Sequence, residues 1–303
     1  MPPLLTPVAN WVRGHPAIRR TAHAAVGAIP DLRWTVRVAD LGRVRIRLRR
    51  HRWFLWEAFG EHDGPLFAAF ERLIRPGDVV YDIGANIGVY ARVMAQWFGA
   101  SYVVAIEPMV DNFELLQENI ALGDIRAVAL HLAASDRTGE ETLQVDDVTS
   151  GTAVLDSVAH GAPSAGRRSA GLPPRTESVR VERLDDLVER AALPPPAMIK
   201  IDTEGAEIQV LAGAERTLRA HRPRLSIALH GVDKAEGTLR LLTRLGYTCA
   251  GPVRDAPTAP PTWRELRPDD AQRLANNNIV AAFEAELVRE PITTRPAGPR
   301  ARG

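Results

Sequence analysis

The residues with the clearest chemical potential lie in a short turn after an apolar run. Val79–Ile83 has the composition of a buried strand and leads into the turn Gly84-Ala85-Asn86-Ile87-Gly88. Glycine tolerates positive φ angles and lets the backbone approach a ligand closely. A helix beginning at Val89 would offer unpaired N–H groups and a partial positive charge. This order of strand, turn and helix predicts a cradle for a nucleotide-like cofactor.

The details of the turn indicate which cofactor it takes. In the dinucleotide fingerprint Gly-x-Gly-x-x-Gly, the middle glycine lets a diphosphate approach, and here Asn86 stands at that position. Asp82, just before the turn, would repel a diphosphate and attract a cationic group. S-adenosylmethionine carries an ammonium and a sulfonium, so it suits this turn better. Glu107 ends the next expected strand 19 residues after Gly88, close to the spacing at which an acid meets ribose hydroxyls.

A second acidic cluster follows a later apolar run. Met198–Ile201 predicts a buried strand, and Asp202 and Glu204 come directly after it. The carboxyl ends of parallel strands form the binding crevice of an open α/β sheet, so we expect both carboxylates where a reaction would occur. His230 ends the next expected strand and could face the same crevice.

Three roles are open to this cluster. Asp202 or His230 could accept a proton from a hydroxyl group. Asp202 and Glu204 could instead hold Mg²⁺, which two neighbouring carboxylates permit and do not require. Alternatively, Glu204 and Glu207 could do no more than favour the start of a helix through its dipole.

The elements that must position these residues alternate along the chain. Period-two patterns on both sides of residues 39–42 predict a β-hairpin, with arginines along one face as a solvated surface or as a rim for an anionic substrate. From residue 66 on, helix and strand patterns alternate, which predicts a parallel sheet with helices on both faces. Strands are expected at 79–83, 102–106, 127–134, 179–183, 198–201, 225–229, 247–250 and 279–283. Helices are expected at 66–74, 89–98, 111–122 with an Asp111 cap, 184–191, 206–220 and 235–245.

These patterns divide the chain into parts. Residues 1–33 are punctuated by prolines and predict an N-terminal arm, and 34–75 predict the hairpin and a helix packed on the core. The main α/β domain is expected over 76–288, with a proline-rich loop at 252–268 and a disordered tail at 289–303. Within it, 145–177 is rich in Ser, Gly, Pro and Arg, which favours a flexible insertion or a lid over the site.

Composition excludes several classes of protein. The 303 residues carry 38 basic and 37 acidic side chains, a net charge of +1, which gives no general case for binding nucleic acid or a membrane surface. Cys249 is the sole cysteine, so an intramolecular disulfide and a cysteine-based zinc site are both excluded, and a reducing, cytoplasmic setting is expected. No apolar run approaches the ~18 residues of a membrane-spanning helix, and the first residues lack the features of a signal peptide.

Five segments in order carry a resemblance to a known family: GDVVYDIGANIGVY, AIEP, LAASDRTGE, VERLDDL and IKIDTEGAEIQVLAGA. From about Asp78 to His230, the chain resembles the FkbM-type S-adenosylmethionine-dependent methyltransferases. The resemblance implies a Rossmann-like class I methyltransferase domain over 76–288, with a mostly parallel seven-stranded sheet and an antiparallel last strand. It also implies methyl transfer to a hydroxyl of a sugar, glycan or natural product, with S-adenosylmethionine as cofactor.

Position by position, the resemblance assigns roles to residues of this chain. The methionine part of the cofactor would lie on Asp82, Gly84, Ala85, Asn86 and Gly88, the ribose on Glu107 beside Pro108, and the adenine beside Ala134, Ser135 and Asp136. Asp202 and Glu204 would face the transferred methyl group and the acceptor. One departure concerns the strand before His230, which commonly ends Glu-x-His in the family and here reads Ala228-Leu229-His230.

Two other functions remain open. An NAD-dependent oxidoreductase would use the same topology, but Asn86 and Asp82 weaken that interpretation. A non-catalytic module that binds S-adenosylmethionine would keep the turn without turnover, and Ala228 is the feature that favours it.

Overall fold

The computed structural model describes residues 29–52, 54, 63–190, 193–256, 259, 261–274 and 278–290. The expected arm (1–33) and tail (289–303) lie almost wholly outside these residues. The expected hairpin is confirmed: β1 (Arg33–Val38) and β2 (Gly42–Arg47) pair antiparallel across the 3₁₀ turn Ala39–Leu41. Its valines and Ile46 enter the core, which fixes the hairpin against the main domain.

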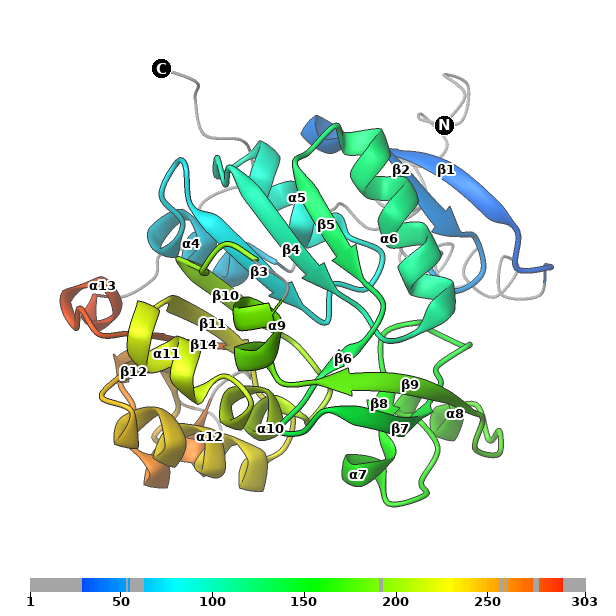
Figure 1. Ribbon diagram of the computed structural model, residues 1–303. Helices are drawn as coiled ribbons and strands as arrows, with labels where there is room; N and C mark the ends of the chain where they lie inside the picture. Colours follow the sequence, from blue (N-terminus) through cyan, green and yellow to red (C-terminus); the bar gives the residue numbers. More distant parts are fainter. Residues whose placement is uncertain are drawn as a thin grey trace.

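The centre of the molecule is one mixed sheet (Figure 1). The described strands follow the order β13-β12-β14-β11-β10-β3-β4-β5. The parallel strands are β3 (Val79–Ile83), β4 (Tyr102–Ile106), β5 (Ala127–Leu130), β10 (Met198–Ile201) and β11 (Arg224–Ala228), and the antiparallel edge consists of β14 (Asn278–Ala282), β12 (Thr248–Val253) and β13 (Thr262–Glu265). The expected Rossmann-like α/β class is confirmed, because parallel strands buried on both faces need helices on each side.

The antiparallel edge differs from the expectation of seven strands and a loop at 252–268. Among the described residues the sheet has eight strands, because β12 extends to Val253 and β13 lies inside the expected loop. Thr262 pairs with Val253 and Glu265 with Ala250. An edge strand needs only one ladder and keeps one side in solvent, so a short polar segment between prolines can still pair.

Helices cover both faces of the sheet (Figure 1). On one face, α4 (Gly64–Leu73), α5 (Val89–Gln96) and α6 (Val110–Gly123) share an apolar core with the hairpin. The other face carries α9 (Leu184–Arg190), α10 (Glu207–Ala212), α11 (Glu215–His221) and α12 (Val232–Arg244). None of the helices in the described parts is long and apolar enough to cross a membrane.

Two helix expectations are corrected. The single helix expected at 206–220 divides at Gly213-Ala214, where the Ala214 N–H bonds to the carbonyl of Leu211, three residues earlier. Gly213 packs against the carbonyl oxygen of Ser135, where a Cβ would lie at 1.9 Å. Asp111 does not cap α6, which begins at Val110; its carboxylate instead accepts hydrogen bonds from Arg47 at 2.9 Å and Arg50 at 2.8 Å.

A smaller sheet lies beside the carboxyl ends of the parallel strands. It has the order β6-β9-β7-β8, formed by β6 (Ala133–Ala134), β9 (Thr176–Glu182), β7 (Gly139–Gln144) and β8 (Val154–Leu155). The single strand expected at 127–134 is therefore two strands in different sheets, with His131 and Leu132 between them. Most of segment 145–177 lies at this sheet, with the short helices α7 (Asp156–Ala159) and α8 (Ala165–Ser169).

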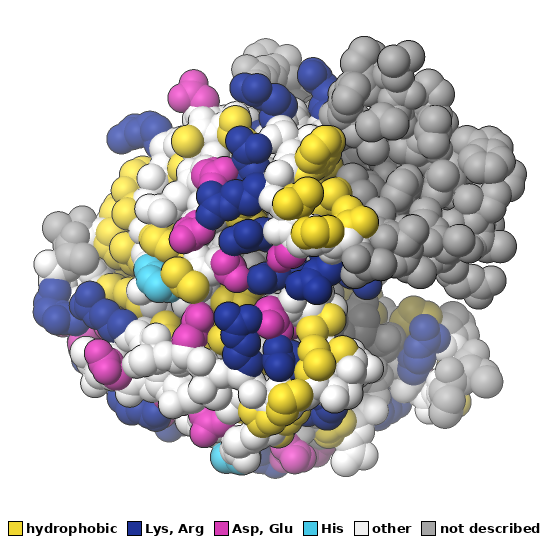
Figure 2. Space-filling model, turned by 90° about the vertical axis from the view of Figure 1, so that its right-hand side faces the viewer, with side chains coloured by type: hydrophobic (Ala, Val, Ile, Leu, Met, Phe, Trp, Pro, Cys, Tyr) yellow, Lys and Arg dark blue, Asp and Glu magenta, His cyan; other side chains and the backbone are white. Residues whose placement is uncertain are grey.

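The arginines of the hairpin contact acidic side chains of α6. Arg33 and Arg45 pair with Glu118 at 2.6 and 2.9 Å, and Arg47 and Arg50 share Asp111. Figure 2 shows blue and magenta side chains interleaved on this side of the molecule. Paired arginines of this kind fit the interpretation as a solvated face better than that of an open anionic-substrate rim.

Candidate functional site

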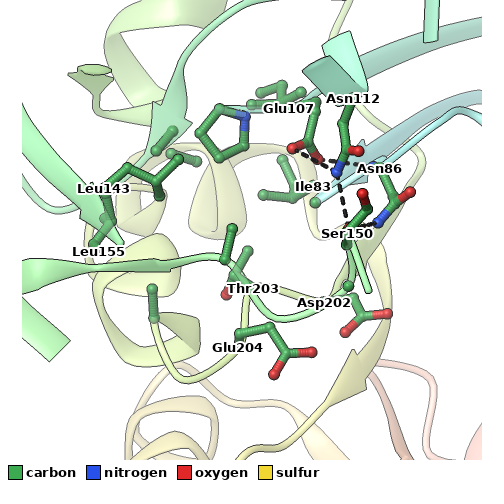
Figure 3. Close-up of a pocket in the computed structure, with 18 residues that line it drawn as sticks. Ile83, Asn86, Glu107, Asn112, Leu143, Ser150, Leu155, Asp202, Thr203 and Glu204 are labelled. Atoms are coloured by element: carbon green, nitrogen blue, oxygen red, sulfur yellow. Dashed lines mark hydrogen bonds between the residues drawn. The ribbon is translucent and has the colours of Figure 1, made fainter. Parts of the chain in front are cut away.

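Two adjoining cavities lie at the carboxyl ends of β3, β4 and β10. Both open to solvent, and the second is the roomier of the two. They share the wall formed by Gly84, Asn86, Gly151, Asp202 and Glu204. Figure 3 shows the first cavity, with Glu107 and Asn112 at one end and Leu143 and Leu155 at another.

The glycine turn has the backbone that its sequence requires. Gly84 has a φ of +78°, and a Cβ there would lie 1.9 Å from the carbonyl oxygen of Asp202. Gly88 has a φ of +79° and packs on Leu116 of α6, so it shapes the start of α5 without lining either cavity. Only glycine combines this φ with such close contacts. Ala85 lines the second cavity, and Asn86 lines both.

Glu107 is the buried acid of the first cavity. Its Oε2 accepts a hydrogen bond from the backbone N–H of Asn86 at 2.8 Å, and its Oε1 accepts one from Met109 at 3.0 Å. Burial raises the pKa of Glu107 to about 7, although these backbone donors oppose the rise. The carboxylate is thus fixed at the cavity with its acceptor capacity only partly used. Pro108 lines the same cavity.

The opposite wall of the first cavity is apolar. Ala133, Ala134, Leu143 and Leu155 line it, and these residues come from β6, β7 and β8. Of the residues expected at the adenine, only Ala134 lines the cavity. Ser135 is buried, with its N–H bonded to the carbonyl of Glu182, and Asp136 is exposed; both lie outside the wall.

Part of segment 145–177, for which the sequence favours a flexible insertion or a lid, contacts the turn. The carbonyl oxygen of Ser150 accepts hydrogen bonds from Asn86 Nδ2 at 2.6 Å and Asn112 Nδ2 at 3.0 Å. The buried Asp146 holds this segment by accepting bonds from the N–H groups of Val148, Thr149, Gly151 and Thr152. The spacing of Asp146 with the following threonines is an Asx-turn signal, but its place against Asn86 depends on long-range folding.

Asp82 lies beneath the turn and lines neither cavity. Its side chain is fully buried, with Lys200 Nζ 3.2 Å away, and Lys200 also lies 3.4 Å from Asp202 Oδ2. Burial lowers the pKa of Lys200, but Asp82 and Asp202 oppose this effect and raise it overall. Lys200 is therefore a charged bridge between the two aspartates, and it also lies over the ring of Tyr90.

The second cavity contains residues that the sequence did not single out. His51, Phe54, Tyr90, Thr149 and Lys200 line it. Burial lowers the pKa of His51 to about 4, and its Nδ1 accepts a hydrogen bond from the N–H of Arg47. A neutral imidazole beside an aromatic side chain gives this cavity one mixed polar and apolar wall.

The acids after β10 meet His230 after β11. His230 Nε2 lies 3.5 Å from Glu204 Oε1 and 3.8 Å from Asp202 Oδ1, while its Nδ1 lies 2.9 Å from Glu207 Oε1. Burial lowers the pKa of His230, but the hydrogen bond to Glu207 and the nearby carboxylates raise it to about 9. Burial raises the pKa of Glu204 to about 7. His230 lines neither cavity, whereas Asp202 and Glu204 line both.

Comparisons with known proteins agree with this geometry. A family model, the methyltransferase FkbM domain, matches residues 82–249. Hexuronic acid methyltransferase AglP of Haloferax volcanii is 27% identical over 47% of this chain and 52% of its own length. The 31-O-demethyl-FK506 methyltransferase FkbM of Streptomyces tacrolimicus is 28% identical over 58% of this chain and 74% of its own. The chain thus spans about half the length of the first of these relatives.

A solved structure, methyltransferase FkbM from Methylobacillus flagellatus KT, has a TM-score of 0.42 and 18% identity, covering 77% of this chain and 52% of that one. The fold assignment rests on the order of the strands in this chain, and the family assignment on the match over 82–249. The chain belongs to the family of the methyltransferase FkbM domain.

Proposed function

We propose that this protein transfers a methyl group from S-adenosylmethionine to a hydroxyl oxygen of a small-molecule or glycan acceptor. The observation that carries the proposal is the buried Glu107 carboxylate beside the glycine turn, in a cavity within the segment that matches the family. The ribose hydroxyls would donate to Glu107, and the adenine would pack against Ala134, Leu143 and Leu155. The methionine part would follow Gly84 and Asn86 toward the second cavity.

The proposed reaction is a direct displacement. A hydroxyl oxygen of the acceptor forms a bond with the methyl carbon, the carbon–sulfur bond breaks, and its electron pair stays on sulfur as S-adenosylhomocysteine. The hydroxyl proton passes to the cluster of Asp202, Glu204 and His230, whose two carboxylates line both cavities. Positioning would supply up to ~7–11 kcal/mol, and a base ~10²–10⁴-fold in rate.

Sugars, glycans and natural products form the proposed acceptor class. The names of the two relatives support it, since one refers to a hexuronic acid and the other to demethyl-FK506. The second name also gives the methylated atom as an oxygen. The mixed wall of the second cavity, with His51, Tyr90 and Phe54, suits polar hydroxyls carried on an apolar frame.

The test combines binding with turnover. Titration calorimetry with S-adenosylhomocysteine is followed by a labelled-methyl assay on a panel of hexuronates, glycosides and macrolides, using the wild type, Asp202→Asn and His230→Ala. We expect cofactor binding and at least a tenfold loss of turnover in both variants. Loss of only a few-fold in both would exclude the cluster as proton acceptor. A thermal shift with NAD but none with S-adenosylhomocysteine would instead favour an oxidoreductase, and binding without any turnover would favour a non-catalytic module.

A further inference from the structure

Three metal-ligand side chains converge beside the two cavities. One atom each from Asp202, Glu204 and His230 lies within 4.8 Å of the other two. The separations of 3.5 and 3.8 Å from His230 Nε2 to the carboxylates exceed ordinary hydrogen-bond distances. Two bonds of ~2.0–2.2 Å to one metal ion span up to about 4.4 Å. The two separations from His230 Nε2 therefore suit ligands of one ion, and the third, between the two carboxylates, is at most 4.8 Å.

The orientation of His230 is fixed from behind. Its Nδ1 lies 2.9 Å from Glu207 Oε1, and the fully buried Glu207 also accepts a hydrogen bond from Gly205 N–H at 2.9 Å. A carboxylate only accepts, so Nδ1 donates its proton to Glu207, and Nε2 is the nitrogen that faces Asp202 and Glu204 and would bind an ion in exchange for its own proton. A carboxylate behind the second nitrogen is the usual outer support of a metal-binding histidine.

Carboxylates also outnumber the basic side chains around the site, which favours binding of a cation. Among the described residues here, Asp82, Asp202, Glu204 and Glu207 contribute four carboxylates. Lys200 balances one of them and contacts Asp202 through Oδ2, so Oδ1 stays directed toward the cluster. Asp202 and Glu204 are about one-third exposed and line both cavities, which leaves room for further ligands on the open side.

We propose that Asp202, Glu204 and His230 form a site for a divalent transition-metal ion, with Glu207 as the positioning residue of His230. One imidazole and two carboxylates suit Mn²⁺ or a similar ion better than Mg²⁺, which prefers oxygen ligands alone. The role of the ion, though not its binding, rests on the proposed function. It would contact the acceptor hydroxyl and lower its pKa.

The experiment titrates Mn²⁺ into the full chain after treatment with a chelator, with electron paramagnetic resonance as readout. We expect one bound Mn²⁺ per chain and a ¹⁴N coupling from one imidazole. Asp202→Asn, Glu204→Gln and His230→Ala should each weaken binding at least tenfold, and His230→Ala should remove the coupling. Glu207→Gln should weaken binding by about 10–100-fold. Glu236→Gln, which alters an exposed carboxylate paired with Arg240, is the matched control and should change nothing.

Titration of S-adenosylhomocysteine into the same samples separates the two proposals and shows that the variants are folded. Wild-type protein that binds the nucleoside but retains no Mn²⁺ would overturn the metal site and leave the proposed function standing. Mn²⁺ binding that persists in all three ligand variants, or that lacks the ¹⁴N coupling, would overturn it as well. Mn²⁺ bound at this site without any affinity for S-adenosylhomocysteine would support the metal site and refute the proposed function.

Discussion

Two groups of charged side chains meet at the end of β10 and differ in their access to solvent. Beneath the turn, Asp82 and Lys200 form a buried ion pair. Above it, Asp202, Glu204 and His230 stay partly exposed, and the two carboxylates line both cavities. Lys200 contacts both groups, through Asp82 and Asp202. An aspartate is present in both groups. Asp82 is enclosed and serves the fold, whereas Asp202 borders the cavities and stays available for chemistry.

The largest expected effect is a loss of stability when the buried ion pair is broken. Lys200→Met leaves the Asp82 carboxylate buried without a partner, which should lower the free energy of unfolding by about 3–5 kcal/mol. Urea unfolding measures it. The double variant Asp82→Asn/Lys200→Met should recover most of the loss, and Glu204→Gln on the open side should change stability by less than about 1 kcal/mol. Equal losses of stability in Lys200→Met and Glu204→Gln would show that the buried group contributes no more to stability than the exposed group.

The second largest effect is a loss of cofactor affinity when the glycine turn between the two groups is changed. Gly84→Ala places a Cβ against the Asp202 carbonyl oxygen, so both cavities must shift and affinity for S-adenosylhomocysteine should fall more than 100-fold. Gly77→Ala is the matched control: its φ of +93° is equally unusual, but no atom lies within 4 Å of the added Cβ. It should cost only about 1 kcal/mol of stability and leave affinity unchanged. Calorimetry with both variants measures the two affinities. A similar loss of affinity in the control would show that close contact with Asp202 is not the cause.

A smaller effect concerns a carboxylate that is buried yet borders a cavity. Glu107→Gln should lower affinity for S-adenosylhomocysteine about 10–100-fold, since bonds to a charged acceptor contribute ~1.5–3 kcal/mol. The pKa of Glu107 in the free protein is about 7. Its charged form binds the ribose, so wild-type affinity should rise as the pH increases from 6 to 8 and then level off. The Glu107→Gln variant should lose this rise, and an unchanged pH profile would exclude the assignment.

The smallest effect tests the segment over the turn. Asn112→Ala removes one of two hydrogen bonds to the Ser150 carbonyl and should weaken nucleoside binding only a few-fold, in line with ~0.5–1.5 kcal/mol per bond. Hydrogen exchange should quicken at residues 146–152 and stay unchanged in β3. Unchanged exchange at residues 146–152 and in β3 would show that the hydrogen bond from Asn86 to Ser150 is sufficient to hold residues 146–152 over the turn.

Features set by interactions between residues close in sequence could be predicted, and features set by contacts between distant residues could not. The turn after β3, the strand bounds 79–83, 102–106 and 198–201, and the convergence of Asp202 with His230 followed from local patterns and from the rule that parallel strands end at one edge. Asp82 shows the limit. Its side chain points to Lys200 on the neighbouring strand, and only the register of β3 with β10 reveals this.

Residues contributed from a distance could not be predicted. Ser150, Asn112 and His51 come from three separate parts of the chain and meet the turn only through the tertiary fold. The edge strand β13 was missed because prolines around it favour a loop, although a strand at the edge tolerates them. The lid or flexible insertion expected at 145–177 stays a prediction. Its residues that line the cavities are Thr149, Ser150, Gly151, Ala153 and Leu155.

The most direct test of the central claim is a crystal structure with S-adenosylhomocysteine. We expect both ribose hydroxyls at about 2.5–2.7 Å from the Glu107 carboxylate, with the sulfur near the shared wall of Asn86 and Asp202. Asp82 should stay on Lys200 without touching the ligand. A nucleoside bound elsewhere, or one whose ribose avoids Glu107, would contradict the account.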